Sequence, residues 1–172
     1  AVTGDGATGG IAGRNVSDSN GPGSTVENCY NIGDVSGSGD VGGVVGYNNN
    51  HLYSGNVSTV KKCYNTGAVI SGNSSNVGGV VGQIATGDVS DCYYLGQEGL
   101  PGIGSVTRPD DTKVTKVENI IQKTAGQFAS GEVAWLLQSG QAEPVWGQQN
   151  LGDADGLPEL TSEKAYSVIQ VT

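Results

Sequence analysis

Three cysteines and one histidine are the residues of this sequence best suited to metal or disulfide chemistry. Cys29, Cys63 and Cys92 follow one another at intervals of 34 and 29 residues, and each precedes a tyrosine. An odd number of cysteines excludes complete pairing within the chain. A zinc site needs closely spaced cysteine pairs or several histidines, and His51 is the single histidine. The pattern therefore predicts reduced, inward-facing thiols stacked in one column, with no metal and no cofactor.

The carboxylates could act as a general acid and base only if the fold brought two of them together. Enzymes built as β-solenoids can assemble such pairs from different turns of the chain. In this sequence the acids do not occupy matching positions, because Glu27 aligns with Lys61, and Asp34 with Ala68. This mismatch indicates dispersed surface acids and predicts no catalytic residue. A polysaccharide-acting enzyme stays the alternative.

Two further motif matches lack the context that their chemistry requires. Residues 37–42 spell Gly-x-Gly-x-x-Gly, but a dinucleotide site needs a helix directly after this loop, and here valines and asparagines follow. Residues 153–156, Asp-Ala-Asp-Gly, are similar to the start of a calcium loop, but Lys164 stands where the distal glutamate belongs. We interpret the first as a chance match and the second as a turn.

Aromatic rings could provide a surface for a sugar ligand, because rings stack on the apolar faces of sugars. Tyr47, Tyr53, Tyr93 and Tyr94 are the residues that could form such a surface. The alternative is that the rings cover corners of the fold and take no part in binding. A glycan or a host surface protein is the partner that the first interpretation implies.

Composition excludes several classes of partner. The net charge of −9 disfavours nucleic acid, which is bound by basic surfaces. No apolar run approaches the ~20 residues that span a bilayer, so we expect no membrane insertion. The sequence contains no methionine and begins within a repeat, which indicates a part of a longer chain.

A repeat with two alternating markers must position these residues. The first marker is Gly-Gly-Val-Val-Gly at 42–46 and again at 78–82, with a degenerate copy at 9–13. The second is Val-x-x-Cys-Tyr, which contains the three cysteines. The glycine pairs recur after 33 and 36 residues. Two markers that share one period of this length are typical of a stacked architecture.

One full repeat, residues 41–76, predicts three or so short strands joined by turns. Residues 44–45, 55–60 and 68–70 contain the β-branched side chains that favour strands. The asparagine-rich run 47–51 favours a polar loop. Because the repeat's inward-facing valine and cysteine are three positions apart, a bulge or corner must lie between them.

The recurring glycines predict how one coil packs on the next. Gly43, Gly46, Gly79 and Gly82 have no side chain, so neighbouring backbone can approach them closely. A unit of this kind cannot bury its apolar face alone, and stacking on the next copy covers its valines. We therefore predict a mainly β fold, a right-handed parallel β-solenoid of about three turns, over residues 1–106. A hairpin-based sandwich would need cleaner alternation.

These repeats resemble a known family. Gly10–Gly13, Gly43–Gly46 and Gly79–Gly82, each followed by Val-x-x-Cys-Tyr, are similar to the GLUG-type repeats of bacterial surface proteins. Repeats of that type resemble those of large adhesin-like proteins and those beside the protease domains of immunoglobulin-A-cleaving metallopeptidases. The resemblance covers roughly residues 9–96, with departures at Ala12 and in the shortened third repeat. It implies an extracellular or cell-surface location on a bacterium.

From residue 107 onward the composition changes, and we expect a small α+β cap over residues 107–172. Residues 124–138 are the best helix candidate, with Thr124 or Ser130 as its N-cap and Gly140 after its end. The apolar face expected of this helix contains Phe128, Ala129, Val133, Leu136 and Leu137, and we expect Trp135 and Leu136 to be structural residues.

Short strands are expected after this helix at 145–146, 157–160 and 166–171. Together with the helix, these segments resemble those that close repeat regions in bacterial surface proteins. An open solenoid end exposes valines and unpaired backbone, so a covering segment is physically reasonable.

The sequence thus predicts a non-catalytic fragment of a secreted or surface protein that serves adhesion or ligand display. The repeat, the acidic composition and the absence of any assembled reactive group in the pattern are the grounds for this prediction. The alternative is the accessory or catalytic region of a β-helical polysaccharide-acting enzyme or of a surface metallopeptidase.

Overall fold

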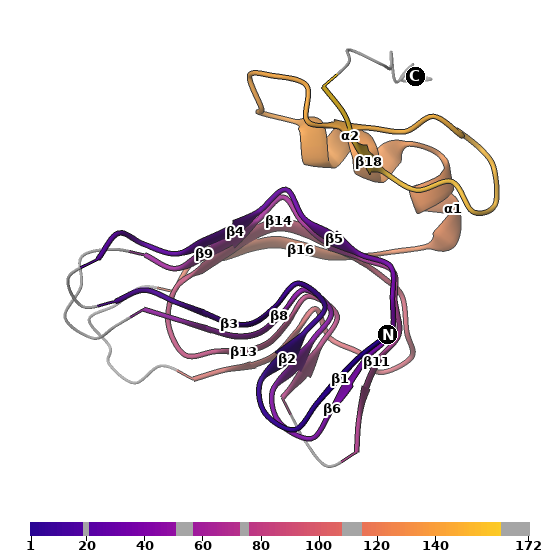
Figure 1. The fold of residues 1–172 in the computed structure, drawn as a ribbon. Helices are drawn as coiled ribbons and strands as arrows, with labels where there is room; N and C mark the ends of the chain where they lie inside the picture. Colours follow the sequence, from indigo (N-terminus) through magenta and orange to yellow (C-terminus); the bar gives the residue numbers. More distant parts are fainter. Residues whose placement is uncertain (19–20, 51–56, 73–75, 108–114, 163–172) are drawn as a thin grey trace. The chain divides into compact units, whose positions relative to one another are not determined.

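The computed structural model describes residues 1–18, 21–50, 57–72, 76–107 and 115–162. The chain divides into two compact units, Ala1–Gln122 and Lys123–Thr172. The first is a mainly β solenoid of stacked parallel sheets, as the sequence predicts (Figure 1). None of the described helices is both long and apolar enough to cross a membrane.

The strands of the solenoid pair in parallel from coil to coil. Two of its sheets contain three very short strands each, and their register is direct, with Val2 opposite Val35 and Val35 opposite Val69. The first sheet consists of β1 (Val2–Gly4), β6 (Val35–Gly37) and β11 (Val69–Ser71), and the second of β2 (Thr8–Gly9), β7 (Val41–Gly42) and β12 (Val77–Gly78).

Two larger sheets complete each coil. One consists of β3 (Ala12–Val16), β8 (Val45–Asn49), β13 (Val81–Ile84) and β15 (Ile103–Val106). The other consists of β4 (Thr25–Glu27), β5 (Tyr30–Asn31), β9 (Thr59–Lys61), β10 (Tyr64–Asn65), β14 (Asp88–Leu95) and β16 (Val117–Lys123). The first two coils therefore each contain five short strands rather than the three or so that the sequence indicated.

The stack continues past the last recognisable repeat. Strand β15 pairs with β13, and Gly104 stands at the position of Gly82 between the paired residues. Strand β16 pairs with β14, although its residues lie in the segment that the sequence assigned to the cap. Except for Lys123, the last residue of β16, both strands belong to the first compact unit, which ends at Gln122 rather than at residue 106.

The recurring glycines allow a sharp fold between neighbouring sheets of one coil. A Cβ atom on Gly42 would lie closer than 3.0 Å to backbone atoms of Val45 and Gly82. The same holds for Gly46 against the backbone of Thr8 and Gly13. Backbone thus packs directly on backbone where the β7 and β8 sheets meet, and any side chain there would force them apart.

The interior of the solenoid combines valines with columns of asparagine. The main cluster of buried residues contains Val44, Val45, Val60, Cys63, Val80, Val81, Ile84, Val89, Cys92 and Tyr94. Asn15 donates through Nδ2 to Asn48 Oδ1 at 2.8 Å, and Asn31 donates to Asn65 Oδ1 at 2.7 Å. These amide ladders satisfy polar groups that would otherwise be buried without partners.

The asparagine ladder also corrects the polar loop expected at 47–51. Residues up to Asn49 continue strand β8, and the Asn48 side chain is fully buried. Asparagine has a low strand propensity, but here its amide gains hydrogen bonds from the neighbouring coil. His51 lies outside the described residues.

A left-handed corner precedes each cysteine, as the spacing of Val60 and Cys63 required. Asn28, Lys62, Asp91 and Asn119 have φ angles between 49° and 55°. Cys63 and Cys92 are buried and Cys29 is half-buried, and all three thiols are free. Backbone hydrogen bonds from Tyr64 N to Cys29 O and from Tyr93 N to Cys63 O stack the column.

The second unit contains two short helices where the sequence indicated one. Helix α1 (Ala125–Ala129) begins at Thr124, whose side chain forms a capping box with Gln127. Helix α2 (Glu132–Gln138) follows Gly131, whose φ of 85° breaks the chain into two segments. Lys123 Nζ lies 2.5 Å from Glu132 Oε1 and links the two segments.

The break at Gly131 changes which residues α2 buries. Val133, Ala134 and Leu137 are buried, whereas Leu136 is half-buried and Trp135 is 44% exposed. The spacing counted from Phe128 does not continue across a left-handed residue, so Leu136 is less buried than the predicted apolar face implied.

Two short strands follow the helices. Strands β17 (Trp146–Gly147) and β18 (Glu159–Leu160) pair antiparallel. Between them Gly156 N donates to Asp153 O at 2.9 Å, so the run 153–156 is a turn. The strand expected at 166–171 lies outside the described residues. The capping role of this unit stays a prediction.

Candidate ligand-binding face

The four tyrosines proposed for a ligand surface lie in different environments. Tyr93 and Tyr94 are only 3% and 6% exposed, so neither presents its ring to a ligand. Tyr94 packs in the core, and a Cβ atom on Gly79 would meet its ring. Tyr53 lies outside the described residues. Tyr47 is half-buried in strand β8 and stays a candidate.

Other tyrosines support the alternative that rings cover the corners. Tyr30, Tyr64 and Tyr93 occupy one register position on successive coils. The rings of Tyr30 and Tyr64 stack with their centroids 5.2 Å apart and their planes at 8°. Aromatic stacking of this kind adds about 0.5–1.5 kcal/mol beyond burial, so this column serves stability.

Tyr47 belongs to a polar column on the outer face of the β3–β8–β13–β15 sheet. Arg14 pairs in register with Tyr47, Tyr47 with Gln83, and Gln83 with Ser105. We call these four residues the lateral ladder. The neighbouring positions, Asn15, Asn48 and Ile84, are buried, so the ladder lies on the opposite side of the strands. Arg14 is exposed there and Tyr47 and Gln83 are half-buried, whereas the hydroxyl oxygen of Ser105 is covered.

Two residues of the lateral ladder, Arg14 and Tyr47, contact each other directly. The Arg14 guanidinium carbon lies 4.8 Å from the centroid of the Tyr47 ring. A cation–π contact at an exposed site contributes about 0.5–1 kcal/mol, which is enough to favour one orientation of the arginine. Gln83 Nε2 donates to Thr107 Oγ1 at 3.0 Å and extends the polar row by one coil.

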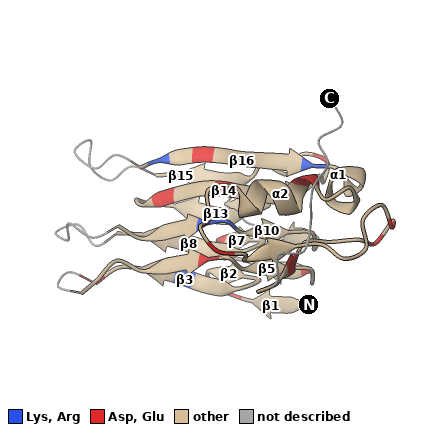
Figure 2. Ribbon diagram, turned by 90° about the horizontal axis from the view of Figure 1, so that it is seen from above, with Lys and Arg blue, Asp and Glu red and all other residues tan. Residues whose placement is uncertain are grey.

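Arg14 differs from the other described cations in its lack of a carboxylate partner. Among the described residues, the four lysines form ion pairs: Lys61 with Glu27, Lys62 with Asp91, Lys116 with Glu118, and Lys123 with Glu132. Figure 2 shows acidic and basic positions interspersed along the strands. Arg14 forms no ion pair within 4.0 Å with an acid of the described residues.

The acids of the solenoid connect successive coils. Asp34 Oδ1 accepts from Ala68 N at 3.0 Å, and Asp88 Oδ1 accepts from Lys116 N at 3.1 Å. The carboxylate of Asp40 accepts from Asn76 at 2.7 Å, and that of Asp91 from Asn119 at 2.8 Å. Each of these four acids thus binds a group 28 to 36 residues further along the chain. Their hydrogen bonds account for them as structural residues.

The surroundings of the thiol column keep its thiols in the neutral, less reactive form. Contact with the Cys63 thiol and then burial raise the pKa of Cys29 far above the usual range of a thiol. At Cys63 the contact with Cys29 lowers the pKa, but the contact with Cys92 and burial outweigh it and raise the pKa overall. Neutral thiols are poor nucleophiles and poor metal ligands. Among the described residues no group of three metal-binding side chains occurs.

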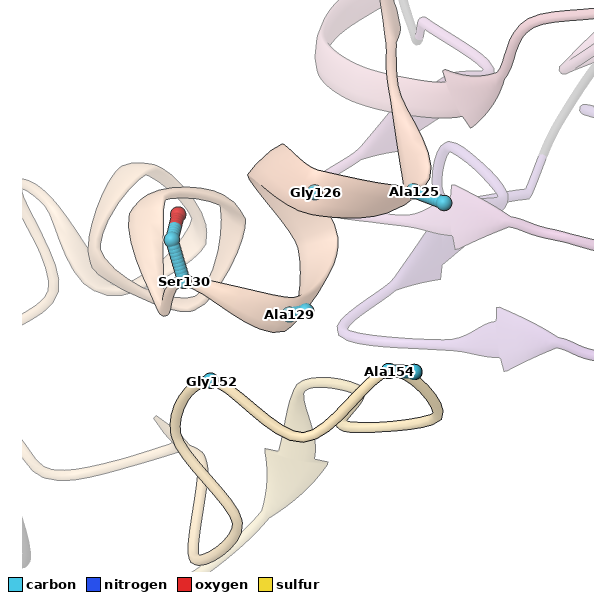
Figure 3. A pocket seen from close by; sticks show the side chains of 6 residues that line it. All are labelled: Ala125, Gly126, Ala129, Ser130, Gly152 and Ala154. Atoms are coloured by element: carbon cyan, nitrogen blue, oxygen red, sulfur yellow. The ribbon is translucent and has the colours of Figure 1, made fainter.

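Two shallow hollows have few polar side chains in their lining, and Glu98 is the one charged residue among them. One, of about 330 Å³, lies in the second unit and is lined by Ala125, Gly126, Ala129, Ser130, Gly152 and Ala154 (Figure 3). Its single side-chain polar group, Ser130 Oγ, donates to Gln127 O at 3.1 Å. The other, of about 260 Å³, includes Gln97, whose amide hydrogen-bonds to the backbone N and O of Val69.

Sequence reasoning missed Arg14, Gln83 and Ser105, although a signal for them existed. Each ladder residue directly follows the last glycine of the first marker: Gly13 precedes Arg14, Gly46 precedes Tyr47, and Gly82 precedes Gln83. Alignment of the repeats would therefore have placed these side chains in one column.

Comparison of the chain with protein-family models, with curated proteins and with solved structures gives no match.

Proposed function

We propose that this chain is a non-catalytic β-solenoid of a secreted or cell-surface bacterial protein, and that it binds glycans along the lateral ladder. The observation that carries the proposal is the in-register row formed by exposed Arg14 and half-buried Tyr47 and Gln83 on three successive coils. Ring, guanidinium and amide are the groups that commonly bind sugars, and here they are held in line by the backbone register.

The geometry of the fold favours an extended ligand. Adjacent parallel strands are about 4.8 Å apart, which is close to the length of one sugar unit in an extended chain. A glycan lying along the solenoid axis would therefore meet one ladder residue per sugar. Such an arrangement needs no deep cavity, because each rung contributes a weak contact and the contacts add along the chain.

The structural roles of the acids support a binding function over catalysis. Asp34, Asp40, Asp88 and Asp91 accept hydrogen bonds from the following coil. A carboxylate that already accepts a hydrogen bond from the neighbouring coil is less free to act as a general acid or base. The resemblance to surface-protein repeats supports the proposed location.

The test is a glycan-array and mucin-binding measurement with the purified protein, followed by a screen for depolymerisation of the glycans that bind. We expect binding that is lost in Tyr47→Ala and kept in Tyr30→Phe, a tyrosine variant of the corner column. Release of shorter glycan products, abolished by changing one or two carboxylates, would instead identify a polysaccharide-acting enzyme. No binding to any glycan would refute the proposal.

A further inference from the structure

We infer that the lateral ladder selects glycans that bear carboxylates, and that Arg14 binds the carboxylate. This inference rests on the proposed function and assigns the ligand class of the same face. Three observations support the inference: the pairing of charges among the described residues, the cation–π contact and the register of the ladder.

The first argument is the imbalance of charge. The chain has 17 acidic residues against 8 basic ones, so cations have an excess of possible partners. The four described lysines each have a carboxylate within 3.3 Å. Arg14 is exposed and has no such partner among the described residues. In an acidic protein, a cation of this kind is suited to an anionic group brought by a ligand.

The second argument is that Tyr47 prepares the guanidinium for binding. The ring lies under the Arg14 guanidinium at 4.8 Å and restricts its movement without using its N–H donors. A planar guanidinium binds a carboxylate through two parallel hydrogen bonds, a geometry that lysine cannot reproduce. Because the side chain is already restricted, it loses less conformational entropy when the ligand binds.

The third argument concerns what lies beside the carboxylate. The next coils present the Tyr47 ring and the Gln83 amide in register with Arg14. A carboxylate on one sugar at Arg14 would place the following sugars over these uncharged groups. Uncharged side chains there can bind hydroxyl groups, so the expected ligand carries an acidic sugar within an extended chain.

The net charge of −9 acts against this ligand at long range. Repulsion between exposed charges is screened beyond about 8 Å at physiological ionic strength, but reaches about 30 Å at 0.01 M. Binding should therefore be measured at physiological ionic strength, where the contact at Arg14 outweighs the distant acids.

The experiment compares matched polymers that differ only in their carboxylates. Polygalacturonate is compared with its carboxyl-reduced, neutral form, and sialylated mucin with sialidase-treated mucin. The proteins are the unmodified chain, Arg14→Gln, Arg14→Lys and, as a control that removes a paired cation, Lys61→Gln. Thermal unfolding of each variant shows whether it is folded.

We expect the unmodified chain to bind at least one acidic polymer about tenfold or more tightly than its neutral counterpart, as a charged hydrogen-bonded pair allows. Arg14→Gln should weaken binding of the acidic polymer about tenfold or more and binding of its neutral form much less, so that the preference is lost. Arg14→Lys should restore only part of it, and Lys61→Gln should leave it unchanged.

Equal binding of both members of both pairs would overturn the inference while leaving the glycan-binding function intact. A preference that persists in folded Arg14→Gln would overturn it as well, because the carboxylate would then be bound elsewhere. Binding of none of these polymers, by a protein that also binds nothing on the glycan array, would refute the inference and the proposed function together.

Discussion

Gly43 lies against the side-chain amide of Asn65, and this contact joins the two markers of the repeat. A Cβ atom on Gly43 would fall closer than 3.0 Å to the Asn65 amide and to Gly79 O of the next coil. Gly10 stands in the same relation to Asn31. The glycine motif and the Cys-Tyr-Asn motif therefore occur together, because the missing side chain of the glycine leaves room for the asparagine amide.

Gly43→Ala should destabilise the solenoid, because both neighbours of the added methyl group are held by hydrogen bonds. Overpacking of this kind typically costs about 1–3 kcal/mol. Urea unfolding measures the loss. Gly72→Ala is the matched control, since no atom of the described residues lies within 4 Å of a Cβ atom there. We expect it to stay within about 0.5 kcal/mol of the unmodified chain. Equal losses in the two variants would contradict the close-packing argument.

The buried amide ladder gives a second prediction. Asn48 accepts from Asn15 at 2.8 Å and donates to Ser58 O at 3.3 Å. Asn48→Ala would remove both buried hydrogen bonds, although Asn15 still donates to Thr59 O and Ser58 O still accepts from Asp88 N. We expect the loss to cost about 1–3 kcal/mol. Thr3→Ala removes an exposed hydrogen bond between the hydroxyl groups of Thr3 and Ser36 on successive coils, and should cost far less. The measurement is the free energy of unfolding of the two variants, and equal losses would contradict the prediction.

The repeat markers were sufficient to predict the parallel solenoid, because glycine pairs and apolar columns are visible in the sequence. They were insufficient for the last coil. There Ile120, Ile121 and Gln122 replace the Cys-Tyr-Asn triplet, and of the second marker only Val117 and the left-handed corner at Asn119 persist. Backbone pairing tolerates such replacements, so sequence similarity ends before the structure does.

The candidate face was harder to predict than the fold. Tyr47 was visible as an aromatic residue, but Arg14 is 33 residues away in the chain and meets it only through the coil register. The burial of Tyr94 was hidden because it occupies the position where earlier coils have Asn31 and Asn65. A tyrosine in place of a buried asparagine could not be recognised without the packing around Gly79.

The thiol column predicts that stability falls in alkaline solution. The folded-state pKa of Cys29 and Cys63 is raised, whereas thiols of the unfolded chain ionise near pH 8.5. Their contribution is therefore complete below about pH 8 and is lost as the pH rises, because ionisation stabilises the unfolded state. Unfolding free energies between pH 7 and about pH 10 measure this effect.

The control for the alkaline effect is a Cys29→Ala/Cys63→Ala variant, whose stability should depend less on pH than that of the unmodified chain. Alkylation under native conditions should also be slow and become complete on unfolding. Identical pH profiles, or rapid labelling of all three thiols in the folded protein, would show that the column is open to solvent.

The second unit offers a comparison of adjacent leucines. Leu137 is fully buried, whereas Leu136 is half-buried. Leu137→Ala should cost about 2–5 kcal/mol in the stability of this unit, and Leu136→Ala distinctly less. Thermal unfolding of the two variants, monitored at the tryptophans, measures the difference. A larger loss for Leu136→Ala would mean that α2 buries a different face.

The most direct test of the proposed binding face is to map where a glycan binds. Nitrogen–proton correlation spectra of the protein would be recorded while the glycans retained on the array are added. We predict that the shifted amide signals cluster on strands β3, β8 and β13, with the largest changes at Arg14, Tyr47 and Gln83. Shifts confined to the second unit or to other sheets, or no shifts at saturating concentrations, would contradict the account.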